Sequence, residues 1–231
     1  MRTATADAAV WQAAALLLAY PDEAGLGSLP VVRRLLEHVP PQRAQALARV
    51  VEHLSSTPPV ELQASYVETF DSRRRHNLYL TYFAHGDTRK RGTALLRFKQ
   101  TYADAGFVLD AENDGELPDH LCVVLEFAAT VDPDRGRTLM LDHRAGLELL
   151  RISLTETGSP WAGAVQAVCA TLPALRGDER DAVRRLAEEG PPAEEVGLAP
   201  YGGPAFDARL EEARGAQATD LPMPTLRTAA R

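Results

Sequence analysis

Apolar residues along most of the chain recur three and four positions apart, the spacing of residues on one face of an α-helix. In the stretch 42–55, for example, Leu47, Val50 and Leu54 would lie on one continuous apolar stripe. Proline, glycine and aspartate interrupt the pattern between such stretches, as expected for turns. The spacing predicts helices at residues 7–18, 31–38, 42–55, 61–70, 93–105, 118–130, 136–155, 161–171 and 178–188.

Two parts of the chain lack this helical pattern. The run 78–83 is aromatic and apolar enough for a strand, but no partner strand is evident, so we expect helix or irregular structure within 71–91. After residue 190, prolines and glycines become frequent and the apolar periodicity is lost. The predicted architecture is all-α: a single-domain helical bundle over residues 1–189, then an extended or disordered Pro/Gly-rich tail over 190–231.

Composition and charge restrict the function classes. The chain has 231 residues, of which 45% are hydrophobic, enough to bury a core, and its net charge of −7 argues against general nucleic-acid or anionic-membrane binding. Cys122 and Cys169 lie in apolar helical contexts, which favours buried thiols and a reducing cytoplasm. Asp7 and Gln12 interrupt the alanine-rich beginning of the chain, so we expect an amphipathic helix there, not a signal peptide or a membrane span.

The usual catalytic signatures are missing from the sequence. It contains no GxxxxGK[ST] or GxGxxG phosphate loop, no HExxH, no paired CxxC and no GxSxG. The six histidines are scattered instead of paired at ligand spacing. We therefore expect neither an enzyme nor a stably bound metal or cofactor.

The most informative motif is Glu-Leu-Pro-Asp-His-Leu at residues 116–121, directly before an apolar run. Pro118 suits the first position of a helix, and Asp119 would then face the positive end of the helix dipole. Helix capping requires the acid but does not require His120 beside it. Two interpretations remain open: a cap with a buried imidazole, or a pair that points into a recognition groove, where Asp119 receives a cationic group and His120 changes charge near neutral pH.

Aromatic and polar residues are concentrated between residues 66 and 87. They form either a core cluster with hydrogen-bonded tips or the wall of a groove that holds a peptide helix. The basic loop 86–93, which contains Arg89 and Arg91 before a helix, is either a solvated loop or an anion site. The arginine run 73–75 is either a solvated face or a complement to an acidic partner.

Several of these segments, in this order, resemble the nitrate reductase molybdenum cofactor assembly chaperones (NarJ). These proteins are a branch of the all-helical redox-enzyme maturation chaperones of the TorD/DmsD type. The matching segments are LLAYPDE at 17–23, YVETFD at 66–71, LYLTYFAHGDTR at 78–89, RG at 91–92, ELPDHL at 116–121 and EF at 126–127.

The resemblance implies a cytoplasmic chaperone that binds the N-terminal segment of the nitrate reductase catalytic (alpha) subunit. Such a chaperone keeps the apoenzyme competent for insertion of the molybdenum bis-guanine-dinucleotide cofactor, which it would meet only transiently, and it is not part of the final enzyme. Cofactor-insertion machinery is a further implied partner. The implied client-binding residues are Asp119, His120, Glu126, Tyr66, Phe70, Asp71, Tyr79, Tyr82 and His85, with Arg89 and Arg91 as candidate anion or cofactor contacts.

Three alternatives remain at this point. The client could be another molybdoenzyme, recognised by a twin-arginine leader. The chain could be a guanine-nucleotide or cofactor-binding accessory protein that uses the loop 86–92. A helical nucleic-acid regulator is opposed by the acidity of the chain. For the chaperone, we expect Asp119→Ala and His120→Ala to weaken client binding more than folding.

Overall fold

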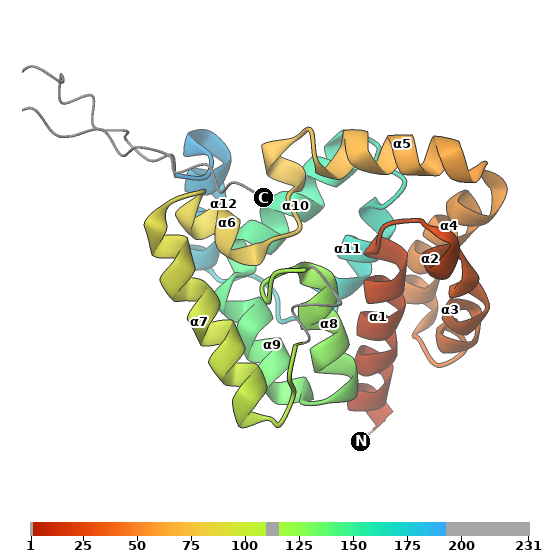
Figure 1. Cartoon of the computed structure of the whole chain (residues 1–231), viewed down its shortest axis with the longest axis horizontal. Coiled ribbons are helices and arrows are strands. Elements are labelled where there is room, and N and C mark those ends of the chain that lie inside the picture. The colour runs from red at the N-terminus through yellow and green to blue at the C-terminus, as the bar shows by residue number, and fades with distance from the viewer. Residues whose placement is uncertain (1, 110–115, 193–231) are drawn as a thin grey trace, which may run out of the picture. The chain divides into compact units, whose positions relative to one another are not determined.

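The computed structural model describes residues 2–109 and 116–192, and within these ranges it is all-helical (Figure 1). The predicted tail, 190–231, lies outside the described residues from 193 onward. The helices are α1 (Arg2–Leu18), α2 (Glu23–Gly27), α3 (Leu29–Leu36), α4 (Pro41–Ser56), α5 (Pro59–Phe70), the 3₁₀-helix η1 (Arg74–His76), α6 (Leu80–His85), α7 (Arg89–Asp104), α8 (Leu121–Thr130), α9 (Pro133–Asp142), α10 (Arg144–Glu156), α11 (Ala162–Cys169) and α12 (Gly177–Glu189).

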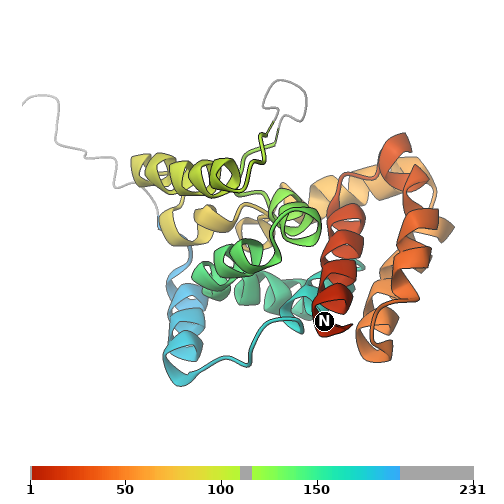
Figure 2. The ribbon, with the colours of Figure 1, turned by 90° about the horizontal axis from the view of Figure 1, so that it is seen from below.

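Helix α1 is the centre of one half of the fold. It packs against α8, α3, α11 and α4, and Figure 2 shows it between α8 on one side and α3 and α4 on the other. Val10, Trp11 and Leu17 are completely buried on it. Burial of such side chains contributes roughly 1.5–3 kcal/mol each, so the alanine-rich sequence forms a core helix.

Asp7, which interrupts the apolar beginning of α1, is itself buried. Its carboxylate lies 2.6 Å from the guanidinium of Arg43 on α4 and 2.8 Å from that of Arg137 on α9. Arg137 also lies over the ring of Trp11, at 5.0 Å from the centroid. Asp7 therefore joins three helices through ion pairs.

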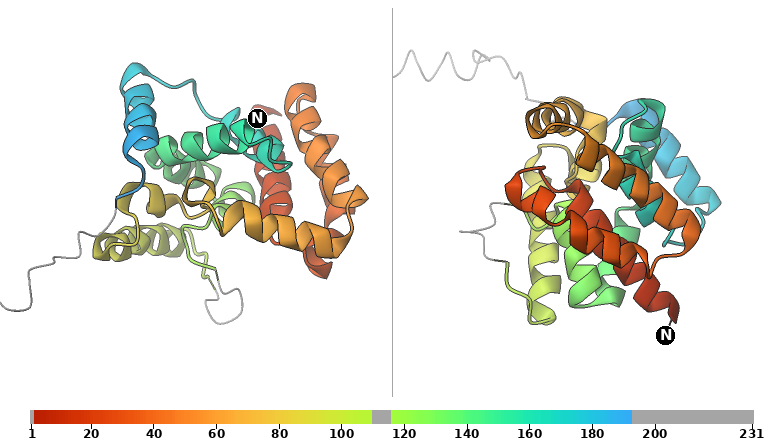
Figure 3. Two further views of the ribbon diagram at one scale, coloured as in Figure 1. Left: turned by 90° about the horizontal axis from the view of Figure 1, so that it is seen from above. Right: turned by 90° about the vertical axis from the view of Figure 1, so that its right-hand side faces the viewer.

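Helix α10 is the centre of the other half. It contacts α12, α11, η1 and α6, and the left panel of Figure 3 shows α12 beside α10 and on the far side from α4. Gly146 permits the contact with α6, since a Cβ atom at this position would lie 2.6 Å from Cβ of Phe83. Gly163 similarly lets α11 approach α4, because its Cβ would lie 2.2 Å from the carbonyl oxygen of Ala46.

The structure corrects three of the predicted helices. The helix predicted at 93–105 is α7, which already begins at Arg89, so residues 89–93 of the predicted basic loop 86–93 are helical. The predicted helix 136–155 is two helices, α9 and α10, which meet at His143 (φ −111°, ψ 23°). Apolar periodicity continues across the break, so the sequence pattern does not reveal it. The predicted helix 118–130 begins only at Leu121, because the backbone before it pairs with another segment.

Candidate functional site

The segments 78–80 and 119–121 lie antiparallel and exchange two backbone hydrogen bonds. The amide of Leu80 donates to the carbonyl of Asp119 at 3.0 Å, and the amide of Leu121 donates to the carbonyl of Leu78 at 2.8 Å. The sequence stretch with strand-like content therefore does have a partner, although the pairing is a single bridge between Tyr79 and His120. We call this pairing the clasp.

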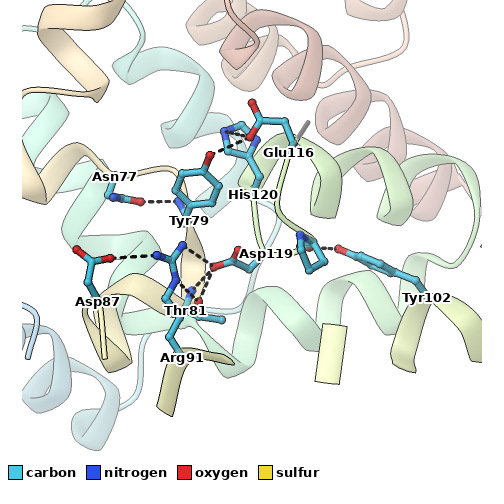
Figure 4. A network of polar contacts seen from close by, with 10 residues as sticks. Asn77, Tyr79, Thr81, Asp87, Arg91, Tyr102, Glu116, Asp119 and His120 are labelled. Carbon is cyan, nitrogen blue, oxygen red and sulfur yellow. Dashed lines mark hydrogen bonds and ion pairs between the residues drawn. The ribbon is translucent and has the colours of Figure 1, made fainter. Parts of the chain in front are cut away.

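Asp119 points from the clasp into the protein and is fully buried (Figure 4). Its Oδ2 accepts hydrogen bonds from the amide of Thr81 at 3.1 Å and from the Thr81 hydroxyl at 2.5 Å. Thr81 is the second residue of α6, so Asp119 caps α6, whose free amides attract a carboxylate. The predicted cap is present, but it stabilises a helix other than the one that follows Asp119 in sequence.

Arg91 closes the inner side of this network. Its Nε donates to the Thr81 hydroxyl at 3.2 Å, and its Nη atoms lie 3.2 Å from Asp87 and 3.8 Å from Asp119. The guanidinium also lies over the ring of Tyr79, at 5.2 Å from the centroid. These internal contacts engage most of the Arg91 guanidinium, while its Nη2 is buried without a hydrogen-bond partner among the described residues. Arg89 is exposed at the beginning of α7.

His120 points from the clasp in the other direction, toward Tyr79 and Glu116 (Figure 4). The His120 and Tyr79 rings meet edge to face at 5.1 Å, and His120 Nε2 lies 3.9 Å from the Glu116 carboxylate. Burial lowers the pKa of His120, and this effect exceeds the opposing effect of the Glu116 and Asp119 carboxylates. The lowered pKa favours a neutral imidazole at neutral pH.

Glu116 is held by the tyrosine of the clasp. The Tyr79 hydroxyl donates to its carboxylate at 3.0 Å, and burial together with this hydrogen bond raises the pKa of Tyr79 to about 12. The Glu116 side chain remains 45% exposed. It therefore presents a fixed negative charge at the surface.

Two adjoining pockets, which we call the groove, lie over the clasp. Their volumes are about 420 and 440 Å³, and they share Tyr20, Tyr66, Glu116 and His120. The first pocket extends toward Phe107 and Glu126, and the second toward Phe70 and Asp71. The described residues that line the groove include three carboxylates, at positions 71, 116 and 126, and no lysine or arginine.

The aromatic wall of the groove is a packed cluster with one polar anchor. Tyr66 donates its hydroxyl to the carbonyl of Leu18 at 2.8 Å, which fixes α5 against the end of α1. Its ring packs edge to face on Tyr20 at 5.4 Å and on Trp161 at 5.7 Å, and it contacts Phe70 at 4.6 Å. Tyr20 is 45% exposed and gives the wall its accessible aromatic surface.

The predicted client-binding residues thus fall into two groups. Tyr66, Phe70, Asp71, Tyr79, His120 and Glu126 line the groove. Asp119, Tyr82 and His85 do not line it: Asp119 and Tyr82 are buried, and His85 is half-buried at the end of α6.

Sequence reasoning missed several groove residues as contacts. Among them are Tyr20, Glu116, Cys122 and the segment 107–109. Tyr20 and Glu116 stand inside the matched segments LLAYPDE and ELPDHL, which was the available signal. Phe107 was noted among the chain's aromatic residues, but nothing in the sequence marks Val108 and Leu109, because they lie in a connection without apolar periodicity.

Other kinds of site find little support in the described part of the chain. Within residues 2–109 and 116–192, no group of three His, Cys, Asp or Glu side chains could hold a metal ion. Both cysteines are free thiols, and burial raises the pKa of each. No described helix is both long enough and apolar enough to cross a membrane.

Comparison with known proteins gives a consistent family. The family model described as "Nitrate reductase delta subunit" matches residues 37–167. The chain is 46% identical over 162 residues to the nitrate reductase-like protein NarX of Mycobacterium tuberculosis, a match that covers 70% of this chain but 24% of NarX. The chain thus spans about a quarter of that relative's length.

A shorter relative matches along most of its length. The Bacillus subtilis protein named as a nitrate reductase molybdenum cofactor assembly chaperone, NarJ, is 32% identical over 163 residues, covering 70% of this chain and 87% of NarJ. Among solved structures, one described as a redox enzyme maturation protein from Archaeoglobus fulgidus superposes with a TM-score of 0.53 at 25% identity, covering 71% of this chain and 91% of that protein. The predicted all-α maturation-chaperone fold is confirmed for the described residues.

Proposed function

This chain belongs to the nitrate reductase delta subunit family, and we propose that it is an assembly chaperone whose groove binds the N-terminal segment of a nitrate reductase catalytic (alpha) subunit. In this proposal it works in the cytoplasm, holds the apoenzyme competent for molybdenum cofactor insertion, and leaves before the enzyme is complete. The name of the B. subtilis relative supports this function class.

The single observation that carries the proposal is the composition of the groove. Aromatic side chains line its wall. Its described lining residues also include three carboxylates, Asp71, Glu116 and Glu126, and no lysine or arginine. An amphipathic helix would bury apolar residues against Tyr20 and Tyr66 and direct a lysine or arginine to Glu116. We therefore propose a basic, amphipathic guest segment.

A third pocket extends the apolar surface. It has a volume of about 270 Å³ and shares Phe107, Val108, Leu109 and Glu116 with the groove. Val108, which lines both the groove and this pocket, is 84% exposed and extends the apolar surface beside the aromatic cluster. A guest of several helical turns could contact both sides of Glu116. In this function the chain would neither make nor break a covalent bond. Its affinity for the client must be moderate, because the client has to be released.

Calorimetric titration of the full chain with a peptide from the N-terminus of the host's alpha subunit tests the proposal. We expect saturable binding, weakened about tenfold by His120→Ala, which removes the imidazole shared by both pockets of the groove. His38→Ala is the matched control, because His38 is exposed near the end of α3 and does not line the groove.

Three results would contradict parts of the proposal. No binding of the alpha-subunit peptide would remove the proposed client. Binding only of a twin-arginine leader from the same host would transfer the function to another molybdoenzyme. Equal weakening by His120→Ala and His38→Ala would place the peptide outside the groove.

A further inference from the structure

A pocket that shares no described lining residue with the groove lies between α10, α11 and α12. It has a volume of about 400 Å³. Its lining residues are Arg144, Glu148, Arg151, Gln166, Cys169, Ala170, Leu175 and Arg180. We call it the arginine pocket.

The charges in the arginine pocket do not balance. Glu148 is 3% exposed, and it is the only carboxylate among the described lining residues. Its two oxygens are occupied by Arg144 Nη2 at 2.7 Å and by Arg151 Nε at 2.5 Å. With Arg180 added on the rim, three guanidinium groups face one carboxylate, which leaves an excess of two positive charges.

The hydrogen-bond donors do not balance either. Arg144 is 6% exposed, and its Nε and Nη1 are buried without a partner among the described residues. Its remaining nitrogen, Nη2, contacts Glu148 and donates to the carbonyl of Pro173 at 3.3 Å. Buried guanidinium donors without an acceptor are costly. Both nitrogens are closed to solvent, so an acceptor in the pocket reaches them only when the Arg144 side chain turns toward it.

The arginines around Asp7 show what a satisfied arrangement looks like in the same fold. There, Arg43 and Arg137 share one carboxylate, and each also donates to a backbone carbonyl, at Ala170 and Thr171 respectively. Neither arginine has a buried nitrogen without a partner. The arginine pocket departs from that arrangement by one additional cation and by unused donors.

We propose that the arginine pocket binds a phosphate group, either as inorganic phosphate or as part of a phosphoester. A dianionic phosphate offsets the excess of two charges and supplies oxygen acceptors for Arg151 and Arg180, and for Arg144 once its side chain turns toward the pocket. This proposal does not rest on the client-binding function. It adds a second candidate anion site, formed by helices other than the one that carries Arg89 and Arg91.

The test is calorimetric titration of the full chain with inorganic phosphate at constant ionic strength. We expect saturable binding that Arg180→Gln weakens about two- to fivefold, as for one partly solvated charge. Arg151→Gln, which also removes a charge-assisted donor, should weaken it about tenfold. Arg185→Gln is the control, because Arg185 is exposed on the same helix but does not line the pocket, and it should leave affinity unchanged.

A titration with glycerol phosphate then separates the two sources of the anion. Tighter binding than that of inorganic phosphate identifies a phosphoester ligand, and weaker binding identifies the free anion. The absence of saturable phosphate binding would overturn the proposal, as would an equal loss of affinity in Arg180→Gln and Arg185→Gln. A thermal melt of each variant, without phosphate, checks that the fold is retained.

Discussion

Asp119 and His120 are neighbours in sequence, yet they belong to two different regions of the molecule. Asp119 is fully buried and stabilises the beginning of α6 through Thr81, whereas His120 lines the groove beside Glu116. The separation follows from the clasp. Successive side chains of an extended segment point to opposite sides, so one residue points inward and the next toward the groove.

The pairing in the clasp changes what we expect of Asp119, for which the sequence predicted a larger effect on client binding than on folding. As a helix start, residues 118–121 would have carried both side chains on neighbouring positions of one turn. In the clasp, Asp119 is expected to affect folding first and client binding only through its effect on the position of His120. In the proposed function, the motif therefore combines a structural role for Asp119 with a recognition role for His120.

The largest expected effect is that of Asp119→Ala on stability. The substitution removes the acceptor for two buried hydrogen bonds and the partner of Arg91, so we expect a loss of about 2–4 kcal/mol in the free energy of unfolding. Urea denaturation followed by circular dichroism measures it. Asp87→Ala is the control, because Asp87 contacts the same arginine from a position that is 78% exposed, and it should cost about 0.5 kcal/mol or less. Equal losses would show that the inward position of Asp119 is wrong.

The second expected effect is a loss of stability on acidification. Burial lowers the pKa of His120, and likewise those of His53, His76 and His143, below the ordinary value of about 6.5. The unfolded chain therefore binds more protons as the pH falls through 6.5 toward the folded pKa values. The stabilisation is present above about pH 6.5 and is lost below it.

Unfolding free energies at about pH 7.5 and about pH 5.5 measure this dependence. Replacing His120 with glutamine should reduce the difference between the two values, since one proton-binding group of the unfolded chain is then missing. The same replacement at His38, which is exposed, serves as the control. An unchanged difference for His120→Gln would indicate that His120 is solvated in the folded protein.

The smallest expected effect concerns a carboxylate at the edge of the groove. Glu126 is exposed and lines one pocket, so Glu126→Gln should weaken binding of a basic client peptide about two- to fivefold and leave thermal stability unchanged. Calorimetry at low and high salt measures the change. Glu68→Gln, at an exposed site outside the groove, is the charge-matched control. Equal weakening by both would show that only net charge attracts the peptide.

Much of the fold was predictable because apolar periodicity is a local property. The apolar stripe within 42–55 predicted α4 (Pro41–Ser56) to within one residue at each end. The charged segment 178–188 predicted α12 (Gly177–Glu189) equally closely. The short helix α2 was missed, because it has no buried residue and hence no apolar stripe. The break at His143 was missed because apolar residues continue on both sides of it.

The sequence predicted which residues belong to the candidate site better than it predicted how their side chains are arranged. The residue types at 66, 70, 79 and 120 indicated an aromatic and polar surface, and these side chains do line the groove. Their sequence positions could not show which way each side chain points. Arg91 was predicted to lie in a glycine-bounded loop, but it lies in the first turn of α7, where its guanidinium contacts Asp87, Thr81 and Tyr79.

The sequence by itself determined the helical class, the acidity and the family resemblance, since these depend on spacing, composition and ordered short motifs. Only the tertiary structure decided that residues 78–80 pair with 119–121, so that Asp119 is buried and His120 lines the groove. Only the tertiary structure brought Arg144, Arg151 and Arg180 to one pocket. The physical reason is that side-chain direction and the meeting of distant charges depend on packing between helices, which no local pattern encodes.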